Sequence, residues 1–352
     1  MSYLSQLSRS VFPHIDAEYV DDPNLLSLHT TQSPYPPSPK AIEAARGFAF
    51  EQLNLYPDPQ CSQLSEAIAA FHGLRADQVF VANGEEEIIS LTIPTFFDAG
   101  DEVASADMTN RLYRTALRMY GVKHRGIEVP EDFRLSAEHF RDLPVHGLLI
   151  TNPDIPTGTT IGRNDMLQIV RENADKIVIV DERYAEFSNC SIAAFVSDYP
   201  NLVVVRTFAK AFGLAGLRCG YAVADAELIS GLRTIKQSLG HYPMDTFTQT
   251  IATAAIGDKD YLAQTVHRIV RTRENVAERL RAMQCQVLPS GANFLMVKPP
   301  NVPASEVAYQ LREQGIIVRH YKYPPVDEYF CVTIVRDEDM QFFLDTMARL
   351  RI

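Results

Sequence analysis

The sequence lacks the features that mark membrane, metal-binding and nucleic-acid-binding proteins. No apolar run approaches the roughly 18–20 residues that span a bilayer, and residues 1–16 hold no secretory apolar segment. The nine histidines form no His-x-His or His-Glu-x-x-His pair, which argues against a metal centre. A net charge of −11 argues against a basic surface for nucleic acid. We therefore expect a cytoplasmic protein whose partners are small molecules.

Cysteine is also scarce and unpatterned. The five cysteines are odd in number and contain no Cys-x-x-Cys spacing, so we expect reduced thiols that mostly pack in the core. What the chain has instead is length and apolar content. Its 352 residues, 46% of them hydrophobic, can bury a large core that divides into about two domains.

Hydrophobic periodicity predicts an α/β fold for the first two thirds of the chain. Between residue 61 and about residue 237, helical segments alternate with short apolar strands, which is typical of a mostly parallel sheet. The helical segments are 62–72, 111–120 and 163–172.

The last third predicts a different organisation. Residues 243–282 carry no strand signal and predict two helices, the second of which joins two domains. A smaller α+β region follows, and its last helix, at 338–350, has Asp337 as the expected N-cap. The predicted division is an N-terminal arm at 1–40, a large domain at 41–265, and a small C-terminal domain at 266–352 against which the N-terminal segment is able to pack.

Polar side chains follow the predicted strands at the points where the strands end. In open α/β sheets ligands bind beyond the carboxyl ends of strands, so these positions are expected to share a site. They are Gly84 at the start of a helix, Asn152, Asp181 with Tyr184, and Lys210 with Arg218. A lone lysine is usually a solvated surface residue, but the matched positions of the other groups favour a functional role for Lys210.

This set suits one ligand that carries a phosphate and a titratable ring. A lysine can hold an aldehyde as an imine, and a carboxylate can keep a pyridine nitrogen protonated so that the ring accepts electrons. Backbone N–H groups at a helix start, together with an arginine, bind phosphate. Pyridoxal 5′-phosphate has these needs, and Lys210 and Asp181 are the residues that it can least do without.

Motifs along nearly the whole chain resemble the class I/II pyridoxal-phosphate aminotransferases, and most of all the histidinol-phosphate aminotransferase family. The stretch Val203–Arg218 around the lysine is the strongest match, and Val180–Phe187 (Val-Asp-Glu-Arg-Tyr-Ala-Glu-Phe) resembles the family's Val-Asp-Glu-Ala-Tyr-x-Glu-Phe. Further matches in family order are Pro34–Lys40, Leu55–Gln60, Ala82–Glu87, Asn152–Gly158 and Gly291–Leu295. The resemblance implies fold type I, with a mostly parallel seven-stranded sheet in a large domain and a smaller α+β domain.

The resemblance also implies roles for the matched residues. Lys210 is expected to form the imine and shuttle a proton, Asp181 to pair with the pyridine nitrogen, and Tyr184 to contact the ring hydroxyl. The other residues expected to bind the cofactor are Gly84, Glu85, Glu86, Asn152, Thr207, Arg218 and Tyr56. Because Tyr56 is expected to reach the site of a partner subunit, the resemblance implies a homodimer with shared sites. Asn293 is expected to contact the substrate.

The chain departs from the family pattern at several cofactor positions. Ile155 stands where an asparagine bonds the ring oxygen, Asn110 where an aromatic residue stacks on the ring, and Ala209 where a serine precedes the lysine. Glu85 stands where a small or hydroxyl residue is usual. Its carboxylate suits a helix start but would repel a bound phosphate.

The expected substrate side departs as well. Cys331 stands where the family has an arginine for the substrate's carboxylate or phosphate. A charged hydrogen bond is worth roughly 1.5–3 kcal/mol, or about one to two decades of affinity, so the substrate's identity is left open. Arg319 and Arg111 are the candidates to supply the positive charge.

Three functions are open at this point. The first is an aminotransferase that moves an amino group between an amino donor and a 2-oxo acid. The second is a decarboxylase similar to threonine-phosphate decarboxylase, which the departures at Cys331, Asn110 and Ile155 motivate. The third is a non-catalytic protein with this fold. The presence of Lys210 and Asp181 disfavours the third, because a binding-only relic has no need of an imine-forming amine.

Overall fold

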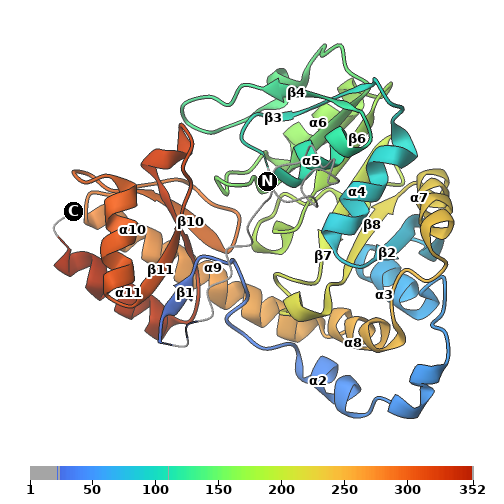
Figure 1. The fold of residues 1–352 in the computed structure, drawn as a ribbon, viewed down its shortest axis with the longest axis horizontal. Coiled ribbons are helices and arrows are strands. Elements are labelled where there is room, and N and C mark those ends of the chain that lie inside the picture. Colours follow the sequence, from blue (N-terminus) through green and yellow to red (C-terminus); the bar gives the residue numbers. More distant parts are fainter. Residues whose placement is uncertain (1–21, 23, 110, 351–352) are drawn as a thin grey trace, which may run out of the picture.

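The chain folds around two β-sheets joined by a long helix (Figure 1). The computed structural model describes Asp22, residues 24–109 and residues 111–350. Helix α9 (Lys259–Ala282) runs between the smaller unit, mostly in orange and red, and the larger unit, from blue to yellow. Within the described residues, no helix is long and apolar enough to cross a bilayer.

The larger sheet is mostly parallel. All its neighbouring strands pair in parallel except at β8, which is antiparallel to both β7 and β2. In sheet order the strands are β2 (Val79–Ala82), β8 (Gly220–Ala224), β7 (Leu202–Thr207), β6 (Ile177–Asp181), β5 (Gly147–Thr151), β3 (Glu102–Ala106) and β4 (Lys123–Ile127). This arrangement confirms the expected α/β fold with a seven-stranded sheet.

Both faces of the larger sheet are buried, because apolar side chains occupy successive positions along its central strands. In β6, Val178 and Val180 belong to one apolar cluster and Ile179 to the other. Helices α3, α6 and α8 contribute to the first cluster, and α4, α5 and α7 to the second. Since neither face of the sheet is open to water, polar side chains that must reach a ligand belong at the strand ends.

The helices begin and end at residues that suit those positions. Helix α3 ends at Gly73, whose φ of 73° is left-handed, and the Asp245 side chain accepts from the Thr248 N–H at 2.8 Å at the start of α8. The helices of this unit are α2 (Pro39–Arg46), α3 (Ser62–His72), α4 (Glu85–Phe96), α5 (Arg111–Met119), α6 (Arg163–Glu172), α7 (Ala226–Leu239) and α8 (Thr246–Ile256).

The smaller sheet takes one edge strand from the N-terminal part of the chain. Strand β1 pairs in parallel with β11, and the other pairs in this sheet are antiparallel. In sheet order the strands are β1 (Leu26–Leu28), β11 (Ile316–His320), β12 (Phe330–Thr333), β10 (Phe294–Lys298) and β9 (Gln286–Val287), with helices α10 (Ala304–Glu313) and α11 (Asp337–Arg349). The pairing of β1 with β11 brings the residues that follow β1 towards the larger unit.

The predicted N-cap of the last helix is wrong by one residue. Helix α11 starts at Asp337 itself, and Arg336 is the capping residue, without a side-chain cap. The Asp337 carboxylate instead accepts hydrogen bonds from Arg271 and Thr272 of α9. The Asp337 carboxylate therefore forms a tertiary contact between α9 and α11, whereas the sequence pattern predicted that it would cap the N-terminus of α11.

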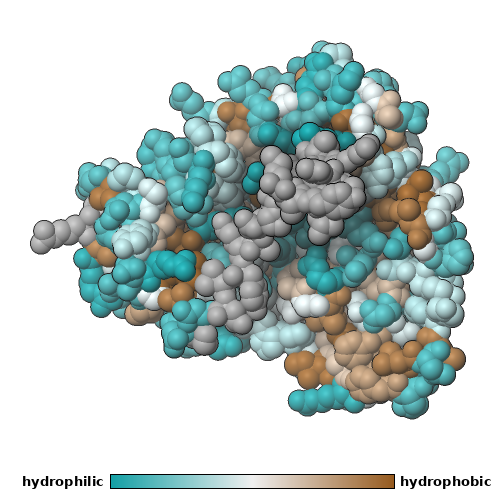
Figure 2. All heavy atoms as spheres, in the orientation of Figure 1, coloured by the Kyte–Doolittle hydropathy of each residue, from teal (hydrophilic) through white to brown (hydrophobic). Residues whose placement is uncertain are grey.

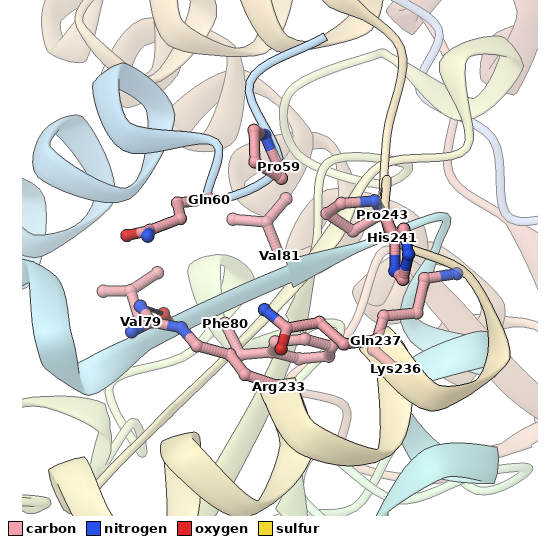
Figure 3. A pocket seen from close by; sticks show the side chains of 10 residues that line it. All are labelled: Pro59, Gln60, Val79, Phe80, Val81, Arg233, Lys236, Gln237, His241 and Pro243. Carbon is pink, nitrogen blue, oxygen red and sulfur yellow. Dashed lines mark hydrogen bonds between the residues drawn. The ribbon is translucent and has the colours of Figure 1, made fainter. Parts of the chain in front are cut away.

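A small cleft lies between β2, α7 and the segment at residues 59–60 (Figure 3). Two cationic side chains that line it make structural contacts. Arg233 donates to the carbonyl oxygen of Val79 at 2.9 Å, and Lys236 pairs with Glu87 at 2.6 Å. Its lining includes no carboxylate or thiol. This cleft therefore offers no set of catalytic groups.

Gly220, the first residue of β8, is a point of close approach between the larger sheet and the start of α4. A Cβ atom added there would lie 2.6 Å from the Glu85 nitrogen and 2.7 Å from the Gly84 carbonyl carbon. Both neighbours are backbone atoms, which cannot move aside without shifting the helix start. Only a residue without a side chain lets α4 begin this close to the sheet.

We expect Gly220→Ala to lower the free energy of unfolding by about 1–3 kcal/mol, the usual cost of overpacking a core. Gly216→Ala is the matched control, because an added Cβ at Gly216 meets nothing within 4 Å. Urea unfolding of both variants measures the difference. Equal stabilities would contradict the role given to Gly220.

Candidate active site

The predicted site residues converge at the carboxyl ends of the central parallel strands. Asp181 is the last residue of β6 and Thr207 the last of β7, while Asn152 directly follows β5. Thr151 pairs in register with Asp181, and Asp181 with Val205, so these strand ends lie side by side. The sheet thus places a carboxylate and a hydroxyl beside the loop that carries the lysine.

Lys210 lies beyond the end of β7, and its ammonium contacts the N-terminal part of the chain. Nζ donates to Thr31 Oγ1 at 2.6 Å and to the Thr31 carbonyl oxygen at 3.4 Å. It also lies 5.4 Å from the ring centre of Tyr184, whose hydroxyl is 3.1 Å from Thr31 Oγ1. The predicted lysine and tyrosine therefore meet around one threonine.

Thr31 is a site residue that the sequence analysis missed. Asn293 Nδ2 donates to the Thr31 carbonyl oxygen at 3.0 Å, and the Thr31 N–H donates to Thr333 Oγ1 at 3.0 Å. Its φ of 54° is unusual for a β-branched residue. Contacts from both units hold this conformation. No strand-end or periodic signal marks a threonine in an irregular arm, so only the tertiary structure reveals it.

Arg183 is a second site residue that the sequence analysis missed, and it donates hydrogen bonds to both oxygens of the Asp181 carboxylate. Its Nε and backbone N–H each donate to Asp181 Oδ1 at 3.1 Å, and Nη2 donates to Oδ2 at 2.5 Å. The Tyr113 hydroxyl also donates to Oδ2. Burial and the negative charge of Asp181 raise the pKa of Tyr113 well above its ordinary value, so this hydroxyl stays a donor.

Arg183 also pairs with Glu85, the first residue of α4. Arg183 Nη1 lies 3.3 Å from Glu85 Oε1, and the two side chains are only 7% and 3% exposed. Burial works against the charge of Glu85, but the positive charge of Arg183, hydrogen bonds from Thr207 and the Glu85 backbone and, more weakly, the charge of Lys210 hold its pKa below its ordinary value. Although burial opposes the charge of Arg183, Asp181, Tyr113 and Glu85 hold its pKa well above its ordinary value. A buried network of two carboxylates and one guanidinium therefore lies across the site.

The signal that could have revealed Arg183 was already in the sequence. In the segment Val180–Phe187 the family pattern has alanine where this chain has arginine. Arginine is rarely buried without an anionic partner, and Asp181 stands two residues before it. The departure was therefore visible, but its partner Glu85, far away in the chain, was not.

The expected phosphate-binding end combines donors with added negative charge. Gly84, with φ of 94°, opens α4, and a Cβ atom there would lie 2.9 Å from Arg218 Nη2, so the guanidinium approaches the backbone closely. Arg218 in turn pairs with Glu86. The Thr207 hydroxyl accepts from the Ala209 N–H at 3.0 Å. Glu85 and Glu86 thus bring two carboxylates to the helix start that the sequence assigned to phosphate.

The expected substrate side faces the smaller sheet. Cys331 of β12 is buried and lies directly opposite Arg319 of β11, so the two side chains project from the same face. Burial raises the pKa of the Cys331 thiol to about 12, against smaller opposing effects of the Arg319 and Lys210 charges. Cys331 is therefore a neutral thiol, and Arg319 is the cation beside it.

Three other positions named from the sequence have separate outcomes. The Asn152 amide exchanges two hydrogen bonds of 2.9 Å with the Ile161 backbone, so it fixes the loop after β5, and its cofactor contact stays a prediction. Tyr56 is 81% exposed and stacks on Tyr242. Asn110 lies outside the described residues.

The chemistry of these residues fits pyridoxal phosphate, with contacts that the cofactor would have to replace. The amine of Lys210, the hydroxyl of Tyr184 and the glycine at the start of α4 match its aldehyde, ring and phosphate. The buried Asn293 Oδ1 has no partner among the described residues and remains able to accept a hydrogen bond. Asp181, however, already receives donors at both oxygens from Arg183.

Sequence comparisons identify the relatives of this chain. The family model described as aminotransferase class I and II matches residues 23–347. The histidinol-phosphate aminotransferase of Marinomonas sp. (strain MWYL1) is 38% identical over 333 residues, which cover 94% of each chain. That of Clostridium botulinum (strain Okra / Type B1) is 32% identical over 348 residues, covering 99% of this chain and 98% of the relative.

Solved structures share the fold. The histidinol-phosphate aminotransferase of Clostridium acetobutylicum has a TM-score of 0.83 at 21% identity, covering 92% of this chain and 98% of that one. The Sinorhizobium meliloti enzyme, solved in complex with pyridoxal 5′-phosphate, has a TM-score of 0.82 at 22% identity, with coverage of 91% and 89%. At these identities the likeness supports the expected fold type I.

Proposed function

The chain belongs to the class I and II aminotransferase family, and from that premise we propose that it transfers an amino group between an anionic primary amine, such as histidinol phosphate, and a 2-oxo acid. It is a pyridoxal-phosphate-dependent aminotransferase, and the comparisons give no support to the decarboxylase alternative. The observation that carries the proposal is the convergence of Lys210, Asp181 and Tyr184 at one edge of the sheet, facing the smaller unit.

Each residue has a chemical task in this proposal. When bound, the cofactor supplies an electron-accepting ring that stabilises negative charge at the substrate's α-carbon. Lys210 removes and returns the proton at that carbon, because its amine is the basic group beside Tyr184. Tyr184 and Asp181 would orient the ring through its hydroxyl and its nitrogen. Thr31 and Asn293 hold the lysine's surroundings in place from the opposite side.

Arg319 is the residue that we propose for the anionic end of the substrate. It lies on the strand next to Cys331 and projects from the same face, within the electrostatic reach of the site. Its guanidinium is exposed and lies 5.1 Å from the ring centre of Tyr321, which helps to orient it. An arginine there restores the charge that Cys331 does not provide.

A homodimer is also part of the proposal. Figure 2 shows hydrophobic surface at the lower right, in the region of the short helix at Phe50–Asn54 and α8. The chain segment at residues 50–56 exposes Leu53 (57%), Leu55 (64%) and Tyr56 (81%). Exposed apolar side chains gathered in one segment favour a protein partner, and we propose that a second copy brings Tyr56 near its partner's site.

The amino-transfer proposal is tested by a half-reaction. Purified protein loaded with pyridoxal phosphate should convert about one equivalent of glutamate or histidinol phosphate to the oxo product before any 2-oxo acid is added. Lys210→Ala should slow this step by more than about 10²-fold, the lower range of acid–base catalysis. Lys259→Ala, at the start of α9, should leave the rate unchanged. Carbon dioxide release, or no oxo product from any amino donor, would contradict the proposal.

The role of Arg319 predicts a change in KM. Arg319→Gln should raise KM for an anionic amine about 10–100-fold, since a charged hydrogen bond is worth roughly 1.5–3 kcal/mol, and should change kcat less. Steady-state kinetics with histidinol phosphate and with histidinol measure the effect. Arg312→Gln, an exposed arginine on α10, is the control. An unchanged KM in Arg319→Gln would exclude Arg319 from the substrate site.

The dimer predicts a mass about twice the 39.5 kDa of one chain by light scattering. Replacing Leu53 and Leu55 together with glutamate should shift the protein to a monomer, because two charges on a buried interface are costly to desolvate. Tyr309→Glu, which is 60% exposed before substitution and lies on α10, should leave the mass unchanged. A wild-type monomer at micromolar concentration would sink this part of the proposal.

A further inference from the structure

We propose that Arg183 is an internal competitor of the cofactor: its guanidinium holds the carboxylate of Asp181, and pyridoxal phosphate binds only when the Arg183 side chain leaves it. The inference rests on the proposed function, in which Asp181 serves the ring nitrogen. It adds that the cofactor has to break the ion pair between Arg183 and Asp181 in order to bind.

The first support is that the acceptor capacity of Asp181 is already used. A carboxylate offers about four lone-pair sites. Arg183 donates to Oδ1 and Oδ2 through Nε, and to Oδ2 through Nη2, while its own backbone N–H and the Tyr113 hydroxyl also donate to this carboxylate. A protonated ring nitrogen that approaches Asp181 therefore has to displace a donor, and Arg183 is the one on a flexible side chain.

The second support is that Glu85 holds the other end of the same guanidinium. Glu85 Oε1 lies 3.3 Å from Arg183 Nη1, and Glu85 begins the helix to which the phosphate would bind. Arg183 therefore links Asp181, the expected partner of the ring nitrogen, to Glu85, which lies at the helix start expected to bind the phosphate.

The third support is that the neighbouring acidic residues do not need Arg183. Glu182 and Glu186 both pair with Arg206, at 2.7 Å each. The segment after β6 therefore has a separate arginine for its structural carboxylates. Among the described residues, the ion pairs of Arg183 are with the two acidic groups of the site, Asp181 and Glu85.

The consequence is a reduced apparent affinity. When only a fraction of the protein has Asp181 free, the apparent dissociation constant rises by the inverse of that fraction. Replacing Arg183 with a residue that has no guanidinium should restore the affinity for the cofactor, although the buried carboxylates of Asp181 and Glu85 then lose their partner. Bound cofactor should then restore more stability to the variant than to the wild type.

The main experiment compares pyridoxal phosphate binding by equilibrium dialysis in the wild type, Arg183→Ala and Arg273→Ala. Arg273 is the matched control, because it is equally buried but donates to the carbonyl oxygens of Phe187 and Ala292. We expect Arg183→Ala to bind at least about tenfold more tightly than the wild type, a change of about 1.4 kcal/mol. Arg273→Ala should match the wild type.

Each outcome separates this inference from the proposed function. Equal affinity of wild type and Arg183→Ala, or no binding by either, would overturn the inference. Tighter binding by Arg183→Ala supports it even if no amino donor reacts, whereas amino transfer by the wild type supports the proposed function whatever Arg183 does.

A second measurement needs no variant to fold. The wild type should prefer pyridoxal phosphate to an analogue with carbon in place of the ring nitrogen by no more than about threefold, because the interaction that the ring nitrogen gains with Asp181 is offset by the loss of the Arg183 contacts. A wild-type preference of more than about tenfold for the ring nitrogen would show that it pairs with Asp181 without having to displace Arg183, and the inference would fall.

Discussion

The burial of the seven-stranded sheet on both faces is the constraint on which the rest of the structure depends. Valines and isoleucines fill both sides of β6 and β7, so a polar side chain that must meet a ligand has its place where the strand ends. Asp181 and Thr207 are the last residues of these two strands, and Lys210 follows. The apolar core and the candidate site are therefore two results of the same pattern.

Charge inside the site has to be balanced locally because water is excluded. Asp181 is fully buried, and Glu85 and Arg183 nearly so. Removing one partner of a buried ion pair typically costs about 3–5 kcal/mol, whereas the intact pair contributes little net stability. The network is thus costly to break and weak as a source of stability. A ligand whose cationic ring nitrogen replaces the guanidinium at Asp181 can exchange with that half of the network, whereas Glu85 still needs a cationic partner.

The position of Lys210 links the two units of the protein. Its ammonium contacts Thr31, whose neighbours in the chain leave β1 of the smaller sheet, while Lys210 itself belongs to the larger unit. Asn293 and Thr333 of the smaller unit bind the backbone of the same threonine. The lysine, the N-terminal arm and the smaller sheet therefore form one contact region, and a change in the arm is expected to reach the catalytic amine.

The sequence by itself determined the α/β fold, the family and the cluster of polar groups at strand ends, because periodicity and strand-end position are local properties of the chain. It also showed that Cys331 and Glu85 depart from the family pattern. Only the tertiary structure decided what those departures mean. It set Arg319 beside Cys331 and paired Glu85 with Arg183, contacts between residues far apart in the chain. Pattern reasoning has no access to them, since they depend on strand register and on the packing of a helix start against the sheet.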